Sequence, residues 1–500
     1  MSNDSVHEPL APVATGIRGL DNVLAGGIPP NRVYLIEGDP GAGKTTLSLQ
    51  FLLEGRARGE TCLYVTLSET AEELTAVAHS HGWDLTGIRV TELATAESSL
   101  SADAENTMFY PSEVELAQTT EIVLREVESI NPSRIVFDSL SEMRMLAQNP
   151  LRYRRQILAL KQFFVGRQCT VLLLDDRSAG PSDIQVQSIV HGVLSLELRT
   201  PDYGVMQRRL QVLKMRGKAY RAGFHDFVIV QGGLRVFPRL VAAEHQIDYA
   251  ADVMESGIPE LDTLMGGGLS RGTSALLVGP AGAGKSTFAT QYAVQVAQRG
   301  ERCAMFMFDE SERTLRQRAQ GVGMNLEAQI DSGRICIRQV DPGELSVGEL
   351  VQLVRTEVEE RGAKLVVIDS LNGYLNAIPD ERFLTLQLHE LLSYLGQRGV
   401  TCILVMAQSG MVGTMTSPVD ASYLADTILL LRYFEAAGEV RQAISVLKRR
   451  GGPHERTIRE FRFTPNGIQI GPPLSQFHGV LTGVPSFLGG EGRLLEEGGP

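Results

Sequence analysis

Short, continuous apolar runs recur along this chain, and each precedes a longer segment in which apolar residues stand three and four apart. Runs such as residues 33–36 and 275–278 lack the alternation of a half-exposed strand, so they predict strands that are buried on both faces. Segments such as residues 114–130 and 347–361 have the spacing of amphipathic helices. Buried strands that alternate with helices predict an α/β fold with a mainly parallel sheet covered by helices.

This pattern is written twice. The segment GIRGLDNVLAGGI (16–28) returns as GIPELDTLMGGGL (257–269), at an offset of 241 residues (257 − 16). The later pairs TCLYVTLSET and RCAMFMFDES, RIVFDSL and LVVIDSL, and LKMRGKAY and LKRRGGPH follow in the same order. We therefore predict two tandem P-loop α/β domains, joined by a linker near residues 239–256. The expected ranges are a flexible N-terminus 1–14, a first domain 15–247, a second domain 248–471 and a loosely held Gly- and Pro-rich tail 472–500.

Each half contains one G-x-x-x-x-G-K-[ST] motif between a predicted strand and a predicted helix, namely GDPGAGKT (38–45) and GPAGAGKS (279–286). In a P-loop the glycines let backbone N–H groups close around phosphates, the lysine adds a charge and the hydroxyl binds Mg²⁺. A single match is also compatible with an ordinary glycine turn, but two matches in the same context predict nucleotide binding. The expected contacts are Gly41, Ala42, Gly43, Lys44, Thr45 and Thr46 in the first half, and Gly282, Ala283, Gly284, Lys285, Ser286 and Thr287 in the second.

Carboxylates end two further strands in each half. Asp138 and Asp369 stand where a Walker B aspartate would hold Mg²⁺ together with Thr45 and Ser286, although a strand-end Asp can also cap the next turn. For hydrolysis, a base or water-positioning residue is expected on a neighbouring strand end. The candidates are Glu69 in the first half and Asp309 with Glu310 in the second; Glu69 and Glu310 each lie 25 residues after the P-loop lysine (69 − 44, 310 − 285). The alternative is a solvated strand end.

A basic pattern closes each half, with Lys214 and Arg216 in the first and Lys448, Arg449 and Arg450 in the second. These residues lie far in sequence from the phosphate loops. We interpret them as trans-acting cations that reach the nucleotide of a neighbouring subunit, which implies a ring or filament. The alternative is a basic strand edge that deters aggregation.

Composition narrows the class of protein. The chain has 500 residues, of which 43% are hydrophobic and 21% charged, and the formal net charge is −12, which disfavours binding to nucleic acid. No apolar run reaches the roughly 18 residues of a membrane helix. The N-terminus has neither the basic start nor the apolar core of a signal peptide. The five cysteines show no C-x-x-C spacing and predict free thiols in a reducing compartment, so we expect a cytoplasmic protein without a membrane segment.

As a set, these motifs resemble the KaiC family of circadian clock proteins, within the RecA-like P-loop superfamily. The likeness rests on the P-loops, VTLSET, HGWDL (81–85), VFDSL and LKMRG in the first half, and on FDES, VIDSL, ADTILLLRY (425–433) and LKRRG in the second. The resemblance implies a double-ring homohexamer that binds ATP and Mg²⁺ at subunit interfaces. It also implies that the first domain acts chiefly as an ATPase, while the second is a serine/threonine autokinase and autophosphatase. By the same resemblance, Ser80, Lys214, Met215 and Arg216 line the first nucleotide site, and Lys448, Arg449, Arg450 and His454 line the second.

The chain also departs from that family. Where the family has two consecutive glutamates, this chain has Ser68-Glu69 and Asp309-Glu310, which leaves Glu69 as the base of the first site. The self-phosphorylated Ser-Thr pair falls on Ser422 and Tyr423, and the alternative is that Ser422 is a plain loop serine. The tail differs too, so a KaiA-like activator is not expected there, whereas a KaiB-like or two-component signalling partner is compatible with the resemblance.

Two other functions are compatible with tandem P-loop domains. One is a RecA- or RadA-like DNA-dependent ATPase, which the net charge and the absence of a zinc-binding cysteine set disfavour. The other is a nucleotide-gated adaptor whose tail docks a signalling partner.

Overall fold

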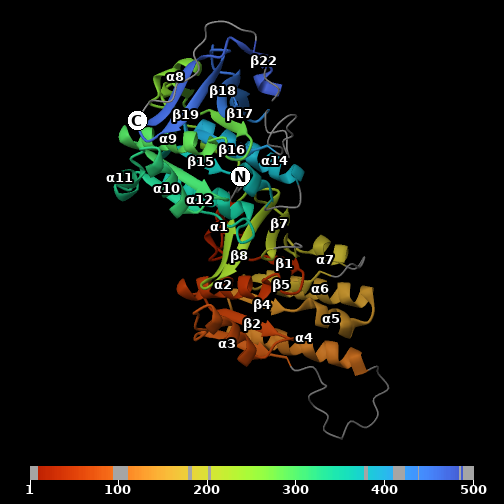
Figure 1. The fold of residues 1–500 in the computed structure, drawn as a ribbon. Helices are drawn as coiled ribbons and strands as arrows, with labels where there is room; N and C mark the ends of the chain where they lie inside the picture. Colours follow the sequence, from red (N-terminus) through yellow and green to blue (C-terminus); the bar gives the residue numbers. More distant parts are fainter. Residues whose placement is uncertain are drawn as a thin grey trace, which may run out of the picture. The chain divides into compact units, whose positions relative to one another are not determined.

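The fold consists of two compact units, Met1–Arg239 and Leu240–Pro500, called the first and second domain below (Figure 1). The division falls eight residues before the predicted boundary at residue 247 (247 − 239). The structure is a computed structural model that describes residues 10–93, 111–177, 183–200, 204–376, 381–408, 423–436, 438–482 and 486–487. None of the helices in these ranges combines the length and apolarity needed to cross a bilayer.

The first domain is built on a nine-stranded sheet in the order β3-β2-β4-β5-β1-β6-β7-β8-β9. Its first six strands run parallel and the last three add in antiparallel fashion. The strands are β1 (Val33–Gly38), β2 (Cys62–Thr66), β3 (Ile88–Glu92), β4 (Arg134–Asp138), β5 (Thr170–Asp176), β6 (Gly192–Arg199), β7 (Gln207–Met215), β8 (Phe224–Val230) and β9 (Gly233–Phe237). The mainly parallel α/β sheet predicted from the sequence is confirmed.

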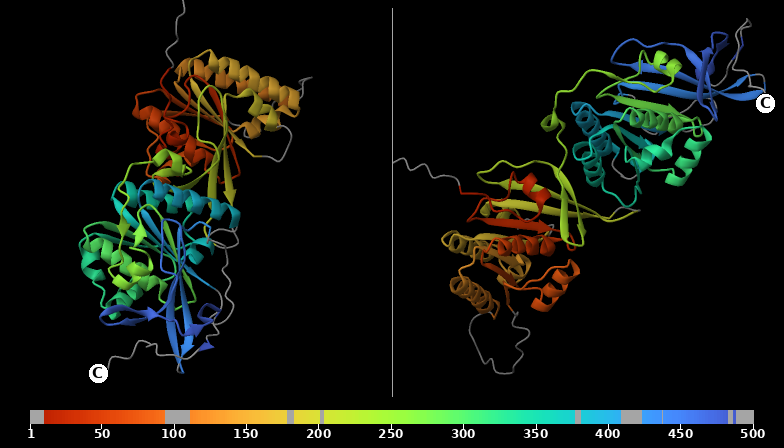
Figure 2. Two further views of the ribbon diagram at one scale, coloured as in Figure 1. Left: turned by 90° about the horizontal axis from the view of Figure 1, so that it is seen from above. Right: turned by 90° about the vertical axis from the view of Figure 1, so that its left-hand side faces the viewer.

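Helices cover both faces of this sheet, as the left view of Figure 2 shows. Residues of β1 alternate between two cores: Tyr34 and Ile36 face α1, α2 and α3, whereas Val33 and Leu35 face α4 to α7. Burial on both faces explains why the strand is a continuous apolar run in the sequence. The helices are α1 (Arg18–Val23), α2 (Lys44–Ala57), α3 (Ala71–Ser80), α4 (Pro111–Ile130), α5 (Leu140–Ala147), α6 (Pro150–Val165) and α7 (Asp183–Ile189).

The second domain repeats this topology, with the strand order β14-β13-β15-β16-β12-β17-β18-β19-β20. Its strands are β12 (Ser274–Gly279), β13 (Arg302–Met307), β14 (Ile335–Gln339), β15 (Ala363–Asp369), β16 (Thr401–Ala407), β17 (Thr427–Ala436), β18 (Glu439–Arg449), β19 (Ile458–Thr464) and β20 (Gly467–Pro473), with a small ladder of β10 (Val253–Met254) and β11 (Leu269–Ser270). Its helices are α8 (Pro259–Leu264), α9 (Lys285–Gln298), α10 (Glu312–Gly321), α11 (Leu326–Asp331), α12 (Val347–Glu359), α13 (Leu371–Asn376) and α14 (Glu381–Gln397).

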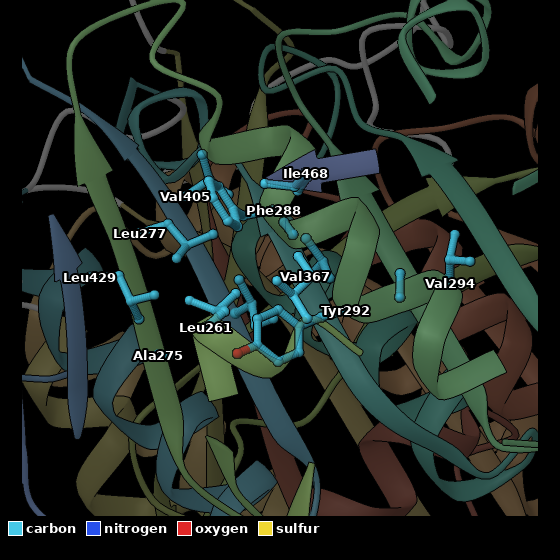
Figure 3. Close-up of a cluster of buried hydrophobic side chains, with 14 of the residues drawn as sticks. Leu261, Ala275, Leu277, Phe288, Tyr292, Val294, Val367, Val405, Leu429 and Ile468 are labelled. Atoms are coloured by element: carbon cyan, nitrogen blue, oxygen red, sulfur yellow. The ribbon is translucent and has the colours of Figure 1, made fainter. Parts of the chain in front are cut away.

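The P-loop helix α9 is the centre of one core of the second domain. Figure 3 shows its residues Phe288 and Tyr292 among Leu277 of β12, Val367 of β15 and Val405 of β16. All five of these side chains are at most 1% exposed. The helix that follows the phosphate loop is therefore fixed against the strands whose ends carry the candidate chemistry.

One buried contact distinguishes the two copies of the P-loop helix. Arg134 at the start of β4 is 1% exposed, and its guanidinium donates to the carbonyl oxygens of Ala14 and Phe51 at 2.8 Å and pairs with Glu60. It fits because Gly55 of α2 has no side chain: a Cβ there would lie 2.5 Å from Arg134 Cδ. At the matching positions the second domain has Val296 and Leu365, at offsets of 241 (296 − 55) and 231 (365 − 134), and both are buried.

Two segments differ from expectation. The expected linker packs onto the second domain, because Leu240 and Ala242 join its core and Val253–Met254 forms β10. The tail was expected to be loose from residue 472, but β20 ends at Pro473, and Phe477 and Val480 pack against Phe434 of β17. Apolar residues spaced within a Gly- and Pro-rich stretch supply this anchoring, which composition alone hides.

The cysteines are as predicted. All five are free, and four are buried while Cys336 is half-buried.

Candidate active site

Both phosphate loops have the same backbone geometry. Each connects the end of a central strand, β1 or β12, to the first turn of α2 or α9, and the helices begin at the lysines Lys44 and Lys285. Gly43 and Gly284 precede those lysines with φ of 100° and 94°, in the left-handed region. A Cβ at Gly284 would also lie 2.2 Å from Phe463 Cζ, so only glycine fits there. The helix N-terminus thereby points its free N–H groups at the loop, which is the geometry of an anion site.

The two loop lysines differ in their partners. Lys44 Nζ donates to the carbonyl oxygen of Gly38 at 2.9 Å and lies 2.8 Å from Oδ1 of Asp176 at the end of β5. Lys285 Nζ donates to the carbonyl oxygens of Gly279 and Pro280 at 3.0 and 2.6 Å. Burial lowers the pKa of Lys285 to about 8, and the charge of Asp369 opposes that shift. Ala407 stands at the position that matches Asp176, so this strand position carries no carboxylate in the second domain.

The Walker B candidates Asp138 and Asp369 lie where the sequence predicted, at the ends of β4 and β15, and both are 6% exposed. Burial raises the pKa of Asp138, against a hydrogen bond from Tyr64 at 2.6 Å and the charge of Lys44. Burial also raises the pKa of Asp369, against a hydrogen bond with Ser286 and the charge of Arg318.

These residues fit the Mg²⁺ that accompanies a nucleoside triphosphate. In the second domain the Ser286 hydroxyl contacts Asp369, and Oδ2 of Asp369 is a buried oxygen without a hydrogen-bond partner among the described residues. Ser286 with Asp369, and by repetition Thr45 with Asp138, would hold the ion, which neutralises charge on the β- and γ-phosphate oxygens when bound.

The first domain has one carboxylate in the position of a base. Glu69 follows β2, where its backbone is held by Thr66: the Glu69 N–H donates to Thr66 Oγ1 at 2.9 Å. Burial raises the pKa of Glu69, and the charges of Asp138 and Glu73 add to the shift. Its Oε2 is buried and has no hydrogen-bond partner among the described residues. A half-buried carboxylate with a free oxygen and a raised pKa suits proton abstraction near neutral pH. The neighbouring Ser68 is exposed.

The second domain has two carboxylates in that position, and both are engaged. Asp309 Oδ2 accepts a hydrogen bond from the Ser370 hydroxyl. Glu310 is paired with Arg318 of α10, which donates from Nε to Oε1 at 3.1 Å and from Nη2 to Oε2 at 2.7 Å. Arg318 Nη1 also donates to Thr287 Oγ1 at 3.0 Å.

The second-domain groups line one cleft of about 840 Å³, which brings together the P-loop, the Walker B strand end and the two carboxylates of that domain. The predicted residues that line it are Gly282, Gly284, Lys285, Ser286, Thr287, Asp309, Glu310 and Asp369.

The basic residues lie beside the start of the central strand of each sheet, whereas the phosphate loop follows the end of that strand. Met215 pairs with Gly192, which pairs with Tyr34 near the start of β1, whereas the loop begins at Gly38. In the second domain Arg449 pairs with Thr427, beside Ala275 at the start of β12. At about 3.3 Å per residue, a strand separates these cations from the phosphate loop of their own domain by on the order of 15 Å. Within one chain the structure does not bring them to the P-loop.

Backbone carbonyls and one acid are among their partners. Lys214 Nζ donates to the Gln187 carbonyl oxygen at 2.6 Å, and burial, with the charges of Arg216 and Lys161, lowers the pKa of Lys214. Lys448 Nζ donates to the Ala425 carbonyl oxygen at 2.8 Å, and Arg450 Nη1 lies 3.4 Å from Asp426 Oδ1.

The remaining predicted site residues are spread out. Ser80 ends α3 and is exposed, with its hydroxyl donating to the Val77 carbonyl oxygen at 2.7 Å. His454 is half-buried after β18. Tyr423 is 51% exposed, and its carbonyl oxygen accepts from Arg450 Nη2 at 3.2 Å. Ser422 lies outside the described residues.

Sequence reasoning missed Tyr64, Asp176, Arg318 and Ser370. Asp176 and Ser370 had a detectable signal, since Asp176 closes the apolar run at residues 170–174 and Ser370 directly follows the Walker B candidate Asp369. Tyr64 and Arg318 had none, because a tyrosine within an apolar strand and an arginine within a basic helix are commonplace.

Comparison with known proteins agrees with this geometry. A family model described as "ATPase: KaiC" matches residues 13–241 and again residues 254–475. The chain is 27% identical over 492 residues to the circadian clock oscillator protein KaiC of Synechococcus elongatus, covering 97% of this chain and 94% of that protein. It is 28% identical over 502 residues to the circadian clock protein KaiC3 of Synechocystis sp., covering 97% of this chain and 96% of that protein. A third relative, the oscillator protein KaiC of Picosynechococcus sp., is 26% identical over 492 residues, with 97% and 94% coverage.

Proposed function

The chain belongs to the KaiC family of ATPases, and we propose that it is a hexameric, ATP-hydrolysing timing or signalling protein of the cytoplasm. The observation that carries this proposal is the duplicated site: in both domains a P-loop lysine and hydroxyl lie next to a buried Walker B aspartate and a strand-end carboxylate. The coverage of clock proteins along nearly their whole length supports the same activity.

The hexamer is proposed from the position of the basic strands. Because Lys214 and Arg216 lie at the far end of the sheet from Lys44, they are positioned to complete a phosphate site only in a neighbouring copy. Six copies joined head to tail would form a closed ring for each domain, with ATP at each interface. Ser80, Met215 and His454 are proposed to line the same interfaces.

An autokinase and autophosphatase activity is proposed for the second domain. Tyr423, which precedes β17, carries an exposed phenol, and the proposal includes Ser422 beside it as an acceptor. A phosphate there would add a charge of roughly −2 next to Arg450, which donates to the backbone of Tyr423. A signalling partner of the KaiB or two-component type would read the phosphorylated state.

One sample tests these proposals together. We expect the purified chain to shift from monomer to hexamer by light scattering when Mg²⁺-ATP is added, and to hydrolyse ATP. Lys44→Ala should abolish the shift and Lys285→Ala should abolish phosphate incorporation, because each removes the charge that grips the phosphates. Phosphosite mapping by mass spectrometry should find phosphate on Ser422 or Tyr423, and none at position 422 in Ser422→Ala.

Three outcomes would contradict the proposal. Wild-type assembly and turnover in both lysine variants would refute the sites, and an unphosphorylated wild type would remove the kinase activity. Stimulation of hydrolysis by single-stranded DNA at about 0.1 M salt would point to a DNA-dependent ATPase instead.

A further inference from the structure

The two sites differ at the residue that faces the carboxylate after the second strand. Glu69 and Glu310 are equivalent, at an offset of 241 (310 − 69), and α3 and α10 start and end at the same offset. On those helices Arg318 matches Val77, which packs against the core of the first domain. A cation therefore faces the carboxylate in the second domain, where the first domain has an apolar side chain.

Arg318 donates two hydrogen bonds to the carboxylate of Glu310. Its Nε and Nη2 bind one carboxylate oxygen each, at 3.1 and 2.7 Å, and the arginine and glutamate side chains are only 22% and 20% exposed. Such a bidentate pair is geometrically specific and stronger than a neutral hydrogen bond. A water molecule can then donate to Glu310 only through the remaining lone pairs of a carboxylate that is already bound to a cation.

The third donor of Arg318 fixes the pair to the phosphate loop. Nη1 donates to Thr287 Oγ1, which lies in the first turn of α9, directly after the Walker hydroxyl residue Ser286. Arg318 thus joins α10, the strand-end loop and the P-loop helix in the cleft that the catalytic candidates line. In the first domain Thr46 matches Thr287, but no arginine reaches it from position 77.

We propose that Arg318 is a positioning residue that competes with the attacking water for Glu310 and so slows ATP hydrolysis at the second site. This inference rests on the proposed ATPase function. In hydrolysis the water oxygen bonds to the γ-phosphorus, the bond from that phosphorus to the β–γ bridging oxygen breaks, and the water proton passes to a carboxylate. Oε2 of Glu69 has no hydrogen-bond partner among the described residues, whereas each oxygen of Glu310 already accepts a hydrogen bond from Arg318.

The test removes the guanidinium that pairs with Glu310, in a variant whose first site is inactive. In a Glu69→Gln background, Arg318→Val is expected to raise ATP turnover about tenfold with KM within about twofold, since a positioned base contributes roughly a hundredfold or more when fully available. Arg318→Val with Glu310→Gln should cancel the gain, and Arg318→Lys should give an intermediate rate. Arg316→Val is the matched control, because Arg316 lies on the same helix but pairs with Glu312 and Glu327.

A reciprocal experiment installs the cation in the first domain. In a Lys285→Ala background, Val77→Arg should lower turnover at the first site about tenfold, while Val77→Leu should not. Thermal melting of each variant separates these effects from misfolding.

The outcomes distinguish this inference from the function on which it rests. If Arg318→Val lowers turnover as Glu310→Gln does, Arg318 supports the base rather than withholding it, and the inference is wrong. An unchanged rate overturns it as well. If neither background hydrolyses ATP at all, the proposed function fails, and the inference falls with it.

Discussion

Single side chains set the two phosphate sites apart. Lys44 has Asp176 at 2.8 Å, whereas Lys285 faces the position occupied by Ala407 and is buried among backbone carbonyls. A carboxylate that already binds the P-loop lysine competes with the γ-phosphate for the same ammonium group. Binding of a triphosphate at the first site therefore requires the ion pair between Lys44 and Asp176 to break.

Removing that competitor should tighten binding. Asp176 is 50% exposed, so the pair is worth at most about 1 kcal/mol, and Asp176→Asn should lower the Kd for Mg²⁺-ATP at the first site by about two- to fivefold. The reciprocal Ala407→Asp should weaken the second site by a similar factor. Titration calorimetry in Lys285→Ala and Lys44→Ala backgrounds, respectively, reads the two sites separately; weaker binding by Asp176→Asn would show that this carboxylate helps to hold Mg²⁺ instead.

The sequence predicts such sites unevenly. P-loops, Walker B aspartates and strand-end carboxylates are found from sequence because each is a local pattern in a fixed context. The contact of Asp176 with Lys44 joins residues 132 apart, and only the order of strands β1 and β5 brings them together. The pair of Glu310 and Arg318 spans a turn, so it follows no helical or strand period.

Whole elements were predicted well wherever burial shapes the sequence. Central strands such as β1 and β12 are buried on both faces and appear as apolar runs. The antiparallel strands β7 to β9 are half-buried, and they were not assigned individually. The anchoring of residues 474–480 on β17 was missed because it depends on a surface that only the folded sheet presents.

The packing of α2 against β4 offers a prediction at the scale of the element. Arg134→Leu alone should destabilise the first domain by about 2–4 kcal/mol, because it leaves Glu60 without its partner and backbone carbonyls unsatisfied. Gly55→Val alone should also destabilise it, because its branches would overlap Arg134.

Combining the two substitutions reproduces the pair found in the second domain, Val296 with Leu365. The double variant should recover most of the loss, giving a coupling energy of about 1–3 kcal/mol in a urea-unfolding cycle. Additive losses would mean that the surrounding core, rather than this pair, distinguishes the two helices.

At the scale of the whole molecule, each of the two sheets places its phosphate loop and its basic residues at opposite ends of its central strands. Chains that lack one half of a site should therefore complement chains that lack the other. In a Lys285→Ala background, Glu69→Gln and Arg216→Ala should each lose most first-site turnover on their own. An equal mixture should regain about a quarter of the unmutated rate, because random assembly pairs an intact carboxylate with an intact arginine at one interface in four.

The control is a mixture of Glu69→Gln with Glu69→Gln/Arg216→Ala, which has no intact carboxylate and should stay inactive. Full turnover by Arg216→Ala on its own would assign the basic strand to protection against edge pairing rather than to a neighbour's phosphate.

The separation of each phosphate loop from its own basic strand also makes output depend on abundance. If the protein forms the proposed ring, a chain diluted below the concentration at which rings persist does not hydrolyse ATP, even when ATP is abundant. ATP turnover then falls more steeply than the number of protein copies, and a drop in synthesis below that concentration abolishes it. The activity of such a protein therefore depends on its own concentration as well as on the concentration of ATP.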